Sequence, residues 1–93
     1  MLEGKTKSGF NFKIDERVLH DVALYSLIGQ YDEGTEIQKI AVLPKLVNLI
    51  LGAKGYEALE KHLRKKNDGF CTMDDMQAEL VQIIQANKET KNS

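Results

Sequence analysis

The apolar positions of the chain first alternate with polar ones and then change to helical spacing. Near the N-terminus Phe10, Phe12 and Ile14 alternate with polar residues, which is the pattern of a strand with one buried face. A Ser-Gly turn pair beginning at Ser8 precedes this strand, so the sequence predicts a β-hairpin over about residues 4–14. Because a two-stranded hairpin is barely stable alone, we expect its phenylalanine face to pack on helices.

From Glu16 onward the apolar positions recur every three or four residues, as in amphipathic helices. Asp15 is a suitable N-cap for the first helix, in which we expect an irregularity near Asp21, and Thr35 is a suitable N-cap for the second. Proline is favoured in a first helical turn, so Pro44 predicts a new helix there. The predicted helices cover about residues 16–31, 36–42, 43–51, 55–66 and 73–86.

These elements predict a mostly helical α+β fold, in which the N-terminal hairpin packs on a small bundle of about four helices. The 93 residues suit one modest core, so we expect residues 1–87 to form a single domain. The polar ending, residues 88–93, is expected to be a disordered tail.

Composition narrows the classes of function. The formal net charge of -1 gives no general attraction to nucleic acid or to an anionic membrane, and we expect neither as a partner. A lone cysteine, Cys71, cannot form an intramolecular disulfide, which favours a reducing, cytoplasmic environment. The longest apolar stretch, residues 41–53, is interrupted by Pro44, Lys45 and Asn48 and is too short to span a bilayer.

No group of residues in the sequence has the spacing of a catalytic or ligand-binding motif. His20 and His62 are expected at a helix surface and at the edge of the core, and neither belongs to a metal-binding spacing. The stretch "GAKG" is too short for a phosphate-binding loop. The sequence therefore predicts a protein that is not an enzyme, with no catalytic residues, metal, cofactor or small-molecule substrate.

Three stretches of the chain resemble a known protein family. They are "GKTKSGFNFKID" at the start, "LPKLVNLILGAKGYEALEKHLRKKNDG" in the middle, and a late helix with the pattern "M..M..E". Their order is similar to that of the tail assembly chaperones of long-tailed, siphovirus-type bacteriophages and prophages of Gram-positive bacteria. The likeness covers Gly4 to about Asn87.

This resemblance implies that the chain binds the tape measure protein and keeps it soluble during tail tube assembly. It also implies a location in the cytoplasm of the bacterial host, absence from the mature virion, and a possible encounter with the tail tube protein. Self-association is expected as well. Two alternatives stay open: a small DNA-binding regulator using residues 56–86, and a structural tail or head-completion component retained in the virion.

A chaperone for a long helical client needs apolar patches that can pair with a helix. Leu49 lies off the main stripe of its helix, and methionines suit adaptable surfaces. The candidate protein-binding residues are the following apolar side chains: Phe10, Phe12, Val42, Leu49, Met73 and Met76.

Overall fold

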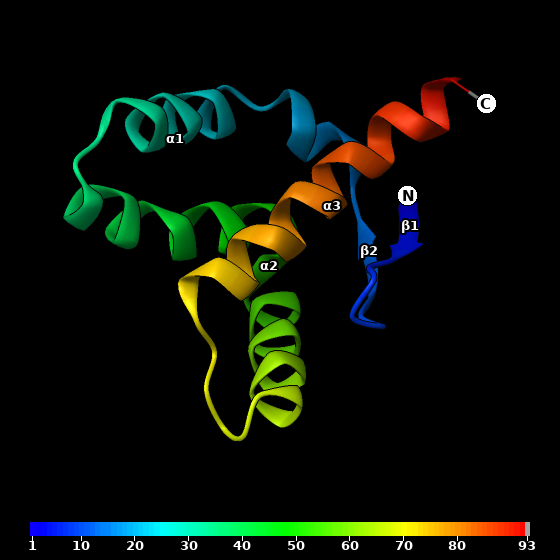
Figure 1. Cartoon of the computed structure of the whole chain (residues 1–93). Coiled ribbons are helices and arrows are strands. Elements are labelled where there is room, and N and C mark those ends of the chain that lie inside the picture. Colours follow the sequence, from blue (N-terminus) through cyan, green and yellow to red (C-terminus); the bar gives the residue numbers. More distant parts are fainter. Residues whose placement is uncertain (93) are drawn as a thin grey trace.

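The chain forms a β-hairpin followed by helices (Figure 1). The computed structural model describes the backbone of residues 1–92 and the side chains of residues 1–86. Its elements are strands β1 (Leu2–Lys5) and β2 (Asn11–Ile14), the 3₁₀ helix η1 (Glu16–His20), and helices α1 (Val22–Glu33), α2 (Glu36–Lys66) and α3 (Met73–Asn92). The predicted fold class is confirmed: the fold is mostly helical α+β, with a two-stranded antiparallel hairpin packed on three helices.

The hairpin forms where its alternating pattern predicted, and β1 begins slightly earlier, at Leu2. In its register Gly4 lies opposite Phe12. A β-carbon at Gly4 would lie 2.6 Å from the end of the Phe12 ring, so the glycine leaves room for this ring in the core. Gly9 turns the chain with a φ of 95°, a value that glycine adopts without steric cost.

The first predicted helix, residues 16–31, is divided at Asp21, which confirms the expected irregularity. Asp15 caps η1 by accepting a hydrogen bond from the Arg17 backbone N–H at 3.0 Å. Asp21 has extended backbone angles and caps α1 in the same way, accepting from the Ala23 N–H at 2.8 Å. Two separate caps therefore start two separate helical segments.

The predicted helix boundary at Leu43 is wrong, because α2 continues through Pro44. The helix starts at Thr35, whose side chain and that of Gln38 form a capping box. One buried stripe then extends across the proline, and its packing offsets the single backbone hydrogen bond that proline removes. The stripe consists of Val42, Leu43, Leu46, Val47 and Ile50.

Helix α3 begins at its predicted position. Thr72 accepts a hydrogen bond from the Asp75 backbone N–H at 3.1 Å, which is one half of the capping box that the sequence suggested. The helix extends to Asn92, beyond the predicted end at Ala86. The predicted disordered tail, residues 88–93, remains a prediction, because the described side chains end at Ala86 and Ser93 lies outside the described residues.

The core lies where α2 meets the inner face of the hairpin and one face of α3. Three of its side chains are completely buried: Val47 and Leu59 from α2, and Ile83 from α3. The hairpin contributes Leu2, Phe10, Phe12 and Ile14.

Candidate functional site

Helix α2 changes direction at Gly52, and this bend brings apolar side chains of α2 and α3 together at the surface. Gly52 has φ 78° and ψ 169°, a combination that is open to glycine and to hardly any other residue. The first half of α2 ends at Leu51, and the second half runs off in another direction, so that the helix is L-shaped (Figure 1). The loop after Lys66 brings the start of α3 back toward the bend (Figure 1).

Two shallow hollows adjoin each other at this bend. One, of about 160 Å³, is lined by Ile40 and Pro44 from the first half of α2, Tyr56 from the second half, and Met73 and Met76 from α3, among others. The other, of about 290 Å³, shares Pro44 and Tyr56 with it and extends to Lys45 and Asn48. We call the two hollows together the elbow groove.

Exposed isoleucines extend the apolar surface of the elbow groove along α2. Ile37 is 79% exposed and Ile40 is 52% exposed. With Pro44 they occupy positions i, i+3 and i+7, which lie on one side of a helix. Phe70, 68% exposed, lies in the loop next to Cys71, which lines the groove. A partner could thus contact a stripe of apolar side chains rather than a single one.

Hydrogen bonds of Arg64 fix one wall of the elbow groove. Its Nη1 donates to the Gly69 carbonyl oxygen at 2.9 Å, and its Nε donates to the Glu60 carboxylate at 3.2 Å. The first bond fastens the loop between α2 and α3 to the second half of α2. The guanidinium charge is therefore engaged within the wall, and the floor of the groove stays apolar.

Burial changes the chemistry of two groups in the groove. Burial raises the pKa of the Cys71 thiol, and the carboxylates of Glu60 and Asp75 raise it further against the opposing charge of Arg64. Burial also raises the pKa of Tyr56, with Glu60 adding to the effect. Because the thiolate is the reactive form of cysteine, a raised pKa lowers the share of reactive thiolate at neutral pH.

The six candidate residues from the sequence lie at several places rather than on one surface. Phe10, Phe12 and Val42 are buried in the core, and Leu49 is partly buried against it. Two of the six reach the elbow groove: Met73, which is partly buried, and Met76, which is buried.

Sequence reasoning missed the exposed apolar residues at the groove. Ile37 and Ile40 do carry a signal in the sequence. They are three residues apart on one side of the helix, and they precede the buried stripe that starts at Val42. Phe70 follows a turn sequence, where an aromatic residue has no core position to fill. In the sequence, an apolar residue that does not fit the buried pattern was therefore the signal for an exposed side chain.

A second group of polar side chains, which we call the hairpin clamp, holds the turn between β1 and β2 in place. It consists of Thr6 and Ser8 from the turn, His62 from α2 and Glu79 from α3. Thr6 and Ser8 each donate a hydroxyl hydrogen bond to the same oxygen of Glu79, both at 2.7 Å. Glu79 is only 3% exposed, so these bonds replace the water that its carboxylate loses on folding.

The clamp contains a serine, a histidine and a glutamate, but its geometry differs from that of a hydrolytic triad. The Ser8 hydroxyl gives its one proton to Glu79, so it has none to give to His62. The Nε2 atom of His62 lies 3.1 Å from both the hydroxyl and the carbonyl oxygen of Ser8, to which it can donate. In a triad the carboxylate would bind the histidine, and the histidine would accept from the serine. The clamp therefore fastens the hairpin to the helices.

The basic cluster at the end of α2 is largely engaged by internal partners. Lys61 lies 3.2 Å from Glu57, an ion pair that the sequence spacing indicates. Arg64 pairs with Glu60 in the same way, and Lys66 donates to the carbonyl oxygen of Ser8. These cations hold parts of the protein together.

Among the described residues, no group of three or more His, Cys, Asp or Glu side chains is arranged to hold a metal ion. None of the helices in that part of the chain is both long enough and apolar enough to cross a membrane. Comparison of the chain with known protein families, curated proteins and solved structures gives no match.

Proposed function

We propose that the chain is a non-enzymatic tail assembly chaperone of a long-tailed bacteriophage or prophage, acting in the cytoplasm of the bacterial host. It binds the tape measure protein, keeps it soluble while the tail tube assembles, and is absent from the mature virion. The resemblance of residues 4–87 to that family supports this proposal. The elbow groove is the observation that carries it.

The groove suits a helical client because it presents its own apolar stripe. Ile37, Ile40 and Pro44 lie along one side of α2, and Tyr56 and Met73 border them. An amphipathic helix of the client can lay apolar residues at positions i, i+3, i+4 and i+7 against such a surface. A long helical client offers many stripes of this kind.

The shallow form of the groove agrees with the need to release the client. Weak individual contacts let each copy leave when tail tube protein polymerises around the tape measure protein. Many copies on one filament hold it together through multivalency, even though each contact is weak.

A DNA-binding role receives less support from the side-chain contacts. Lys61, Arg64 and Lys66 engage partners within the protein, so binding phosphates would compete with these contacts.

The protein composition of purified phage particles distinguishes a chaperone from a structural component of the virion. Mass spectrometry of purified particles should not detect this chain if it is a chaperone, and its presence there at tail stoichiometry would favour the structural role.

Co-expression tests the proposed function. The chain is produced together with the tape measure protein encoded near it, and the soluble fraction of that client is measured with and without the chain. Ile37→Asp combined with Ile40→Asp places two charges in the apolar stripe and should greatly lower the soluble fraction. Val22→Asp is the matched control, because Val22 is 81% exposed and lies on α1, outside the residues that line the groove.

The client should be soluble with the unaltered chain and with Val22→Asp, and should precipitate with the double variant. If the client is equally insoluble with and without the unaltered chain, the proposed function is wrong. If all three forms of the chain protect the client equally, the function stands and the elbow groove is not its binding surface.

A further inference from the structure

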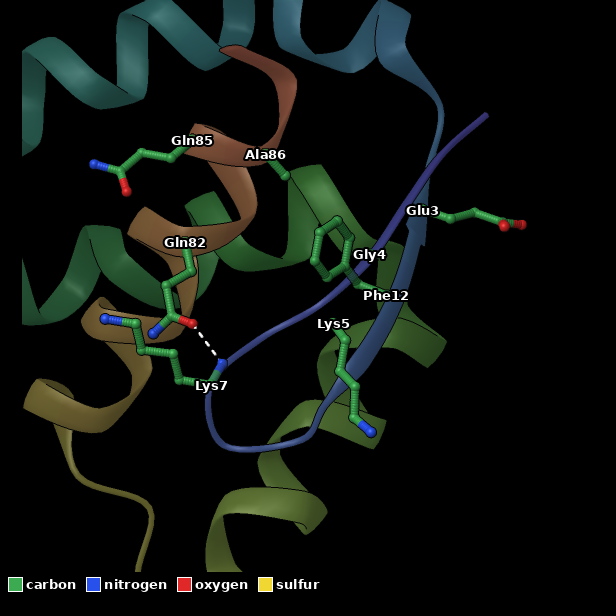
Figure 2. Close-up of a pocket in the computed structure, with 8 residues that line it drawn as sticks. All are labelled: Glu3, Gly4, Lys5, Lys7, Phe12, Gln82, Gln85 and Ala86. Atoms are coloured by element: carbon green, nitrogen blue, oxygen red, sulfur yellow. Dashed lines mark hydrogen bonds between the residues drawn. The ribbon is translucent and has the colours of Figure 1, made fainter. Parts of the chain in front are cut away.

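Among the residues that the structure describes, strand β1 pairs with β2 on one side and with no strand on the other, which we call its open edge. On its other side lies a hollow of about 430 Å³, lined by Glu3, Gly4 and Lys5 of the strand and by Gln82 and Gln85 of α3, among others (Figure 2). At Lys7 the helix closes this edge, because the Lys7 backbone N–H donates to the Gln82 side chain at 2.7 Å (Figure 2). In the described part of the chain, no strand pairs with Glu3, Gly4 and Lys5 on this side.

The register of the hairpin shows which backbone groups face the open edge. Thr6 donates its backbone N–H to Phe10, so these two form a hydrogen-bonded pair. Such pairs alternate along an antiparallel ladder, so Gly4 also points its N–H and C=O toward β2. The N–H and C=O groups of Glu3 and Lys5 therefore face the open edge.

The side chains of the same two residues are complementary in charge. Glu3 and Lys5 are both exposed and lie on the outer face of the hairpin, where the Glu3 carboxylate also lies 3.5 Å from the Lys13 ammonium in a solvent-exposed ion pair. In an antiparallel pair of two β1 strands centred on Gly4, Glu3 of each copy lies opposite Lys5 of the other. These two positions are also the ones with backbone groups available for hydrogen bonds. The charge pattern and the hydrogen-bond pattern thus select the same register.

The neighbouring registers lack this agreement. A pair centred on Lys5 would place Lys5 opposite Lys5 of the second copy, and a pair centred on Glu3 would place Glu3 opposite Glu3. A pair centred on Thr6 would place Lys5 opposite Lys7 of the second copy, and like charges directly opposite each other destabilise a sheet. A pair centred on Leu2 would place Glu3 opposite Met1 and would form no ion pair.

We propose that two copies of this chain associate through β1, antiparallel and centred on Gly4, to form a four-stranded sheet. Backbone hydrogen bonds from Glu3 and Lys5 join the copies, and two Glu3–Lys5 ion pairs set the register. The interface is symmetric, since each copy contributes the same residues. It is also small, so the dimer is weak and depends on protein concentration. This association does not depend on the proposed function.

Sedimentation equilibrium of the full chain tests the dimer, from about 10 µM to about 1 mM, the range in which small interfaces dissociate. The unaltered chain should shift from monomer to dimer over this range. Glu3→Lys alone and Lys5→Glu alone should each lower the association constant by roughly tenfold, because like charges then oppose each other at both pairs. An equal mixture of the two variants should regain association, because each strand then meets its opposite.

A second pair of variants tests the backbone bonds. Lys5→Pro removes an N–H that faces the open edge and that the hairpin does not use, so it should abolish association while the far-ultraviolet circular dichroism is unchanged. Asn11→Pro is the matched control on the other edge of the hairpin, at the position opposite Lys5, and should leave association intact. A chain that stays monomeric up to about 1 mM overturns the proposal. A dimer that Glu3→Lys, Lys5→Glu and Lys5→Pro all leave unaffected overturns it as well.

Discussion

The hairpin and helix α1 both pack on α2, but their side chains are buried to very different extents. The inward side chains of the hairpin, including Leu2, Phe12 and Ile14, are buried, and the hairpin clamp fastens its turn to α2 and α3. Helix α1 has twelve residues, of which only Leu24 is buried. Val22, near its start, is 81% exposed, and Tyr25 is exposed as well.

This difference separates a part of the molecule whose side chains are buried in the core from a part whose apolar side chains remain in contact with water. The hydrogen bonds of the clamp satisfy the buried polar groups of the hairpin turn. The inner face of the hairpin is therefore not exposed to solvent. On the other side, the exposed apolar residues of α1 and of the first half of α2 contribute little to the core. Segments with few buried contacts open more readily, so α1 should be the less stable of the two.

The largest expected effect comes from breaking the hairpin clamp. Glu79→Ala leaves the Thr6 and Ser8 hydroxyls without their shared acceptor, and Thr6 is buried. Hydrogen bonds to a buried charge are strong, so the free energy of unfolding should fall by about 2–4 kcal/mol. Urea denaturation followed by circular dichroism measures this change.

Glu57→Ala is the control for the clamp, since it removes a carboxylate that forms only an exposed ion pair with Lys61. Its effect should be below about 0.5 kcal/mol. Equal losses for the two variants would show that the clamp adds nothing beyond a surface ion pair.

A smaller effect is expected from the bend that separates the two regions. Gly52→Ala places a β-carbon where φ is 78°, and this strain should cost about 1–3 kcal/mol. Gly29→Ala in α1 is the matched control, because a β-carbon at either glycine has nothing within 4 Å. In the regular helix the change should add about 0.5–1 kcal/mol. Thermal unfolding of both variants should show shifts of opposite sign, and a stabilised Gly52→Ala would mean that the bend is not required.

The exposed side should tolerate polar substitutions with little loss of stability. Ile37→Ser and Val22→Ser replace side chains that are mostly in water, so each should change the free energy of unfolding by less than about 0.5 kcal/mol. Leu24→Ser, at the one buried position of α1, is the contrasting variant and should be clearly destabilising. If Ile37→Ser and Leu24→Ser lowered the free energy of unfolding by similar amounts, the division into a buried and an exposed side would be wrong.

The smallest expected effect concerns the charge of Asp15, at the junction between the hairpin and η1. Its hydrogen bonds from the Arg17 side chain and backbone lower its pKa from 3.8 to about 2. A lowered pKa in the folded protein means that the ionised carboxylate stabilises the fold above about pH 4, and that this contribution is lost as the pH falls toward 2.

Asp15→Asn keeps a good N-cap but removes the charge. Stability curves of the two proteins should therefore converge between about pH 4 and pH 2, measured at constant ionic strength. Curves that stay parallel over this interval would show that the carboxylate has no stabilising ionised form.

Local signals in the sequence were enough for most of the fold. The caps at Asp15, Thr35 and Thr72 lie where the sequence indicated, because each depends on a side chain and the few residues after it. The predicted helix boundary at Leu43 was wrong, because it depended on whether a helix was already under way before Pro44. A proline starts a helix only when nothing upstream has started it, and the capping box at Thr35 had done so.

The candidate site was harder to predict than the fold. The sequence shows that Phe12 and Val42 are apolar, but not which apolar side chains another element will cover. The elbow groove depends on the direction that α2 takes after Gly52, and that direction is set by contacts between distant segments. The hairpin clamp likewise joins residues from three parts of the chain, which no short sequence pattern connects.

The position of Glu79 also constrains the order in which the protein is built. The hydroxyl of Thr6 meets a carboxylate 73 residues later in the chain, so a ribosome must add all of those residues before this bond can form. Until then, α3 is not there to cover the nascent hairpin. Helices α1 and α2, which lie next to each other in the sequence, can meet first, since contacts between nearby segments form faster. The hairpin, which precedes the helices in the chain, is thus among the last parts to be held in its final position.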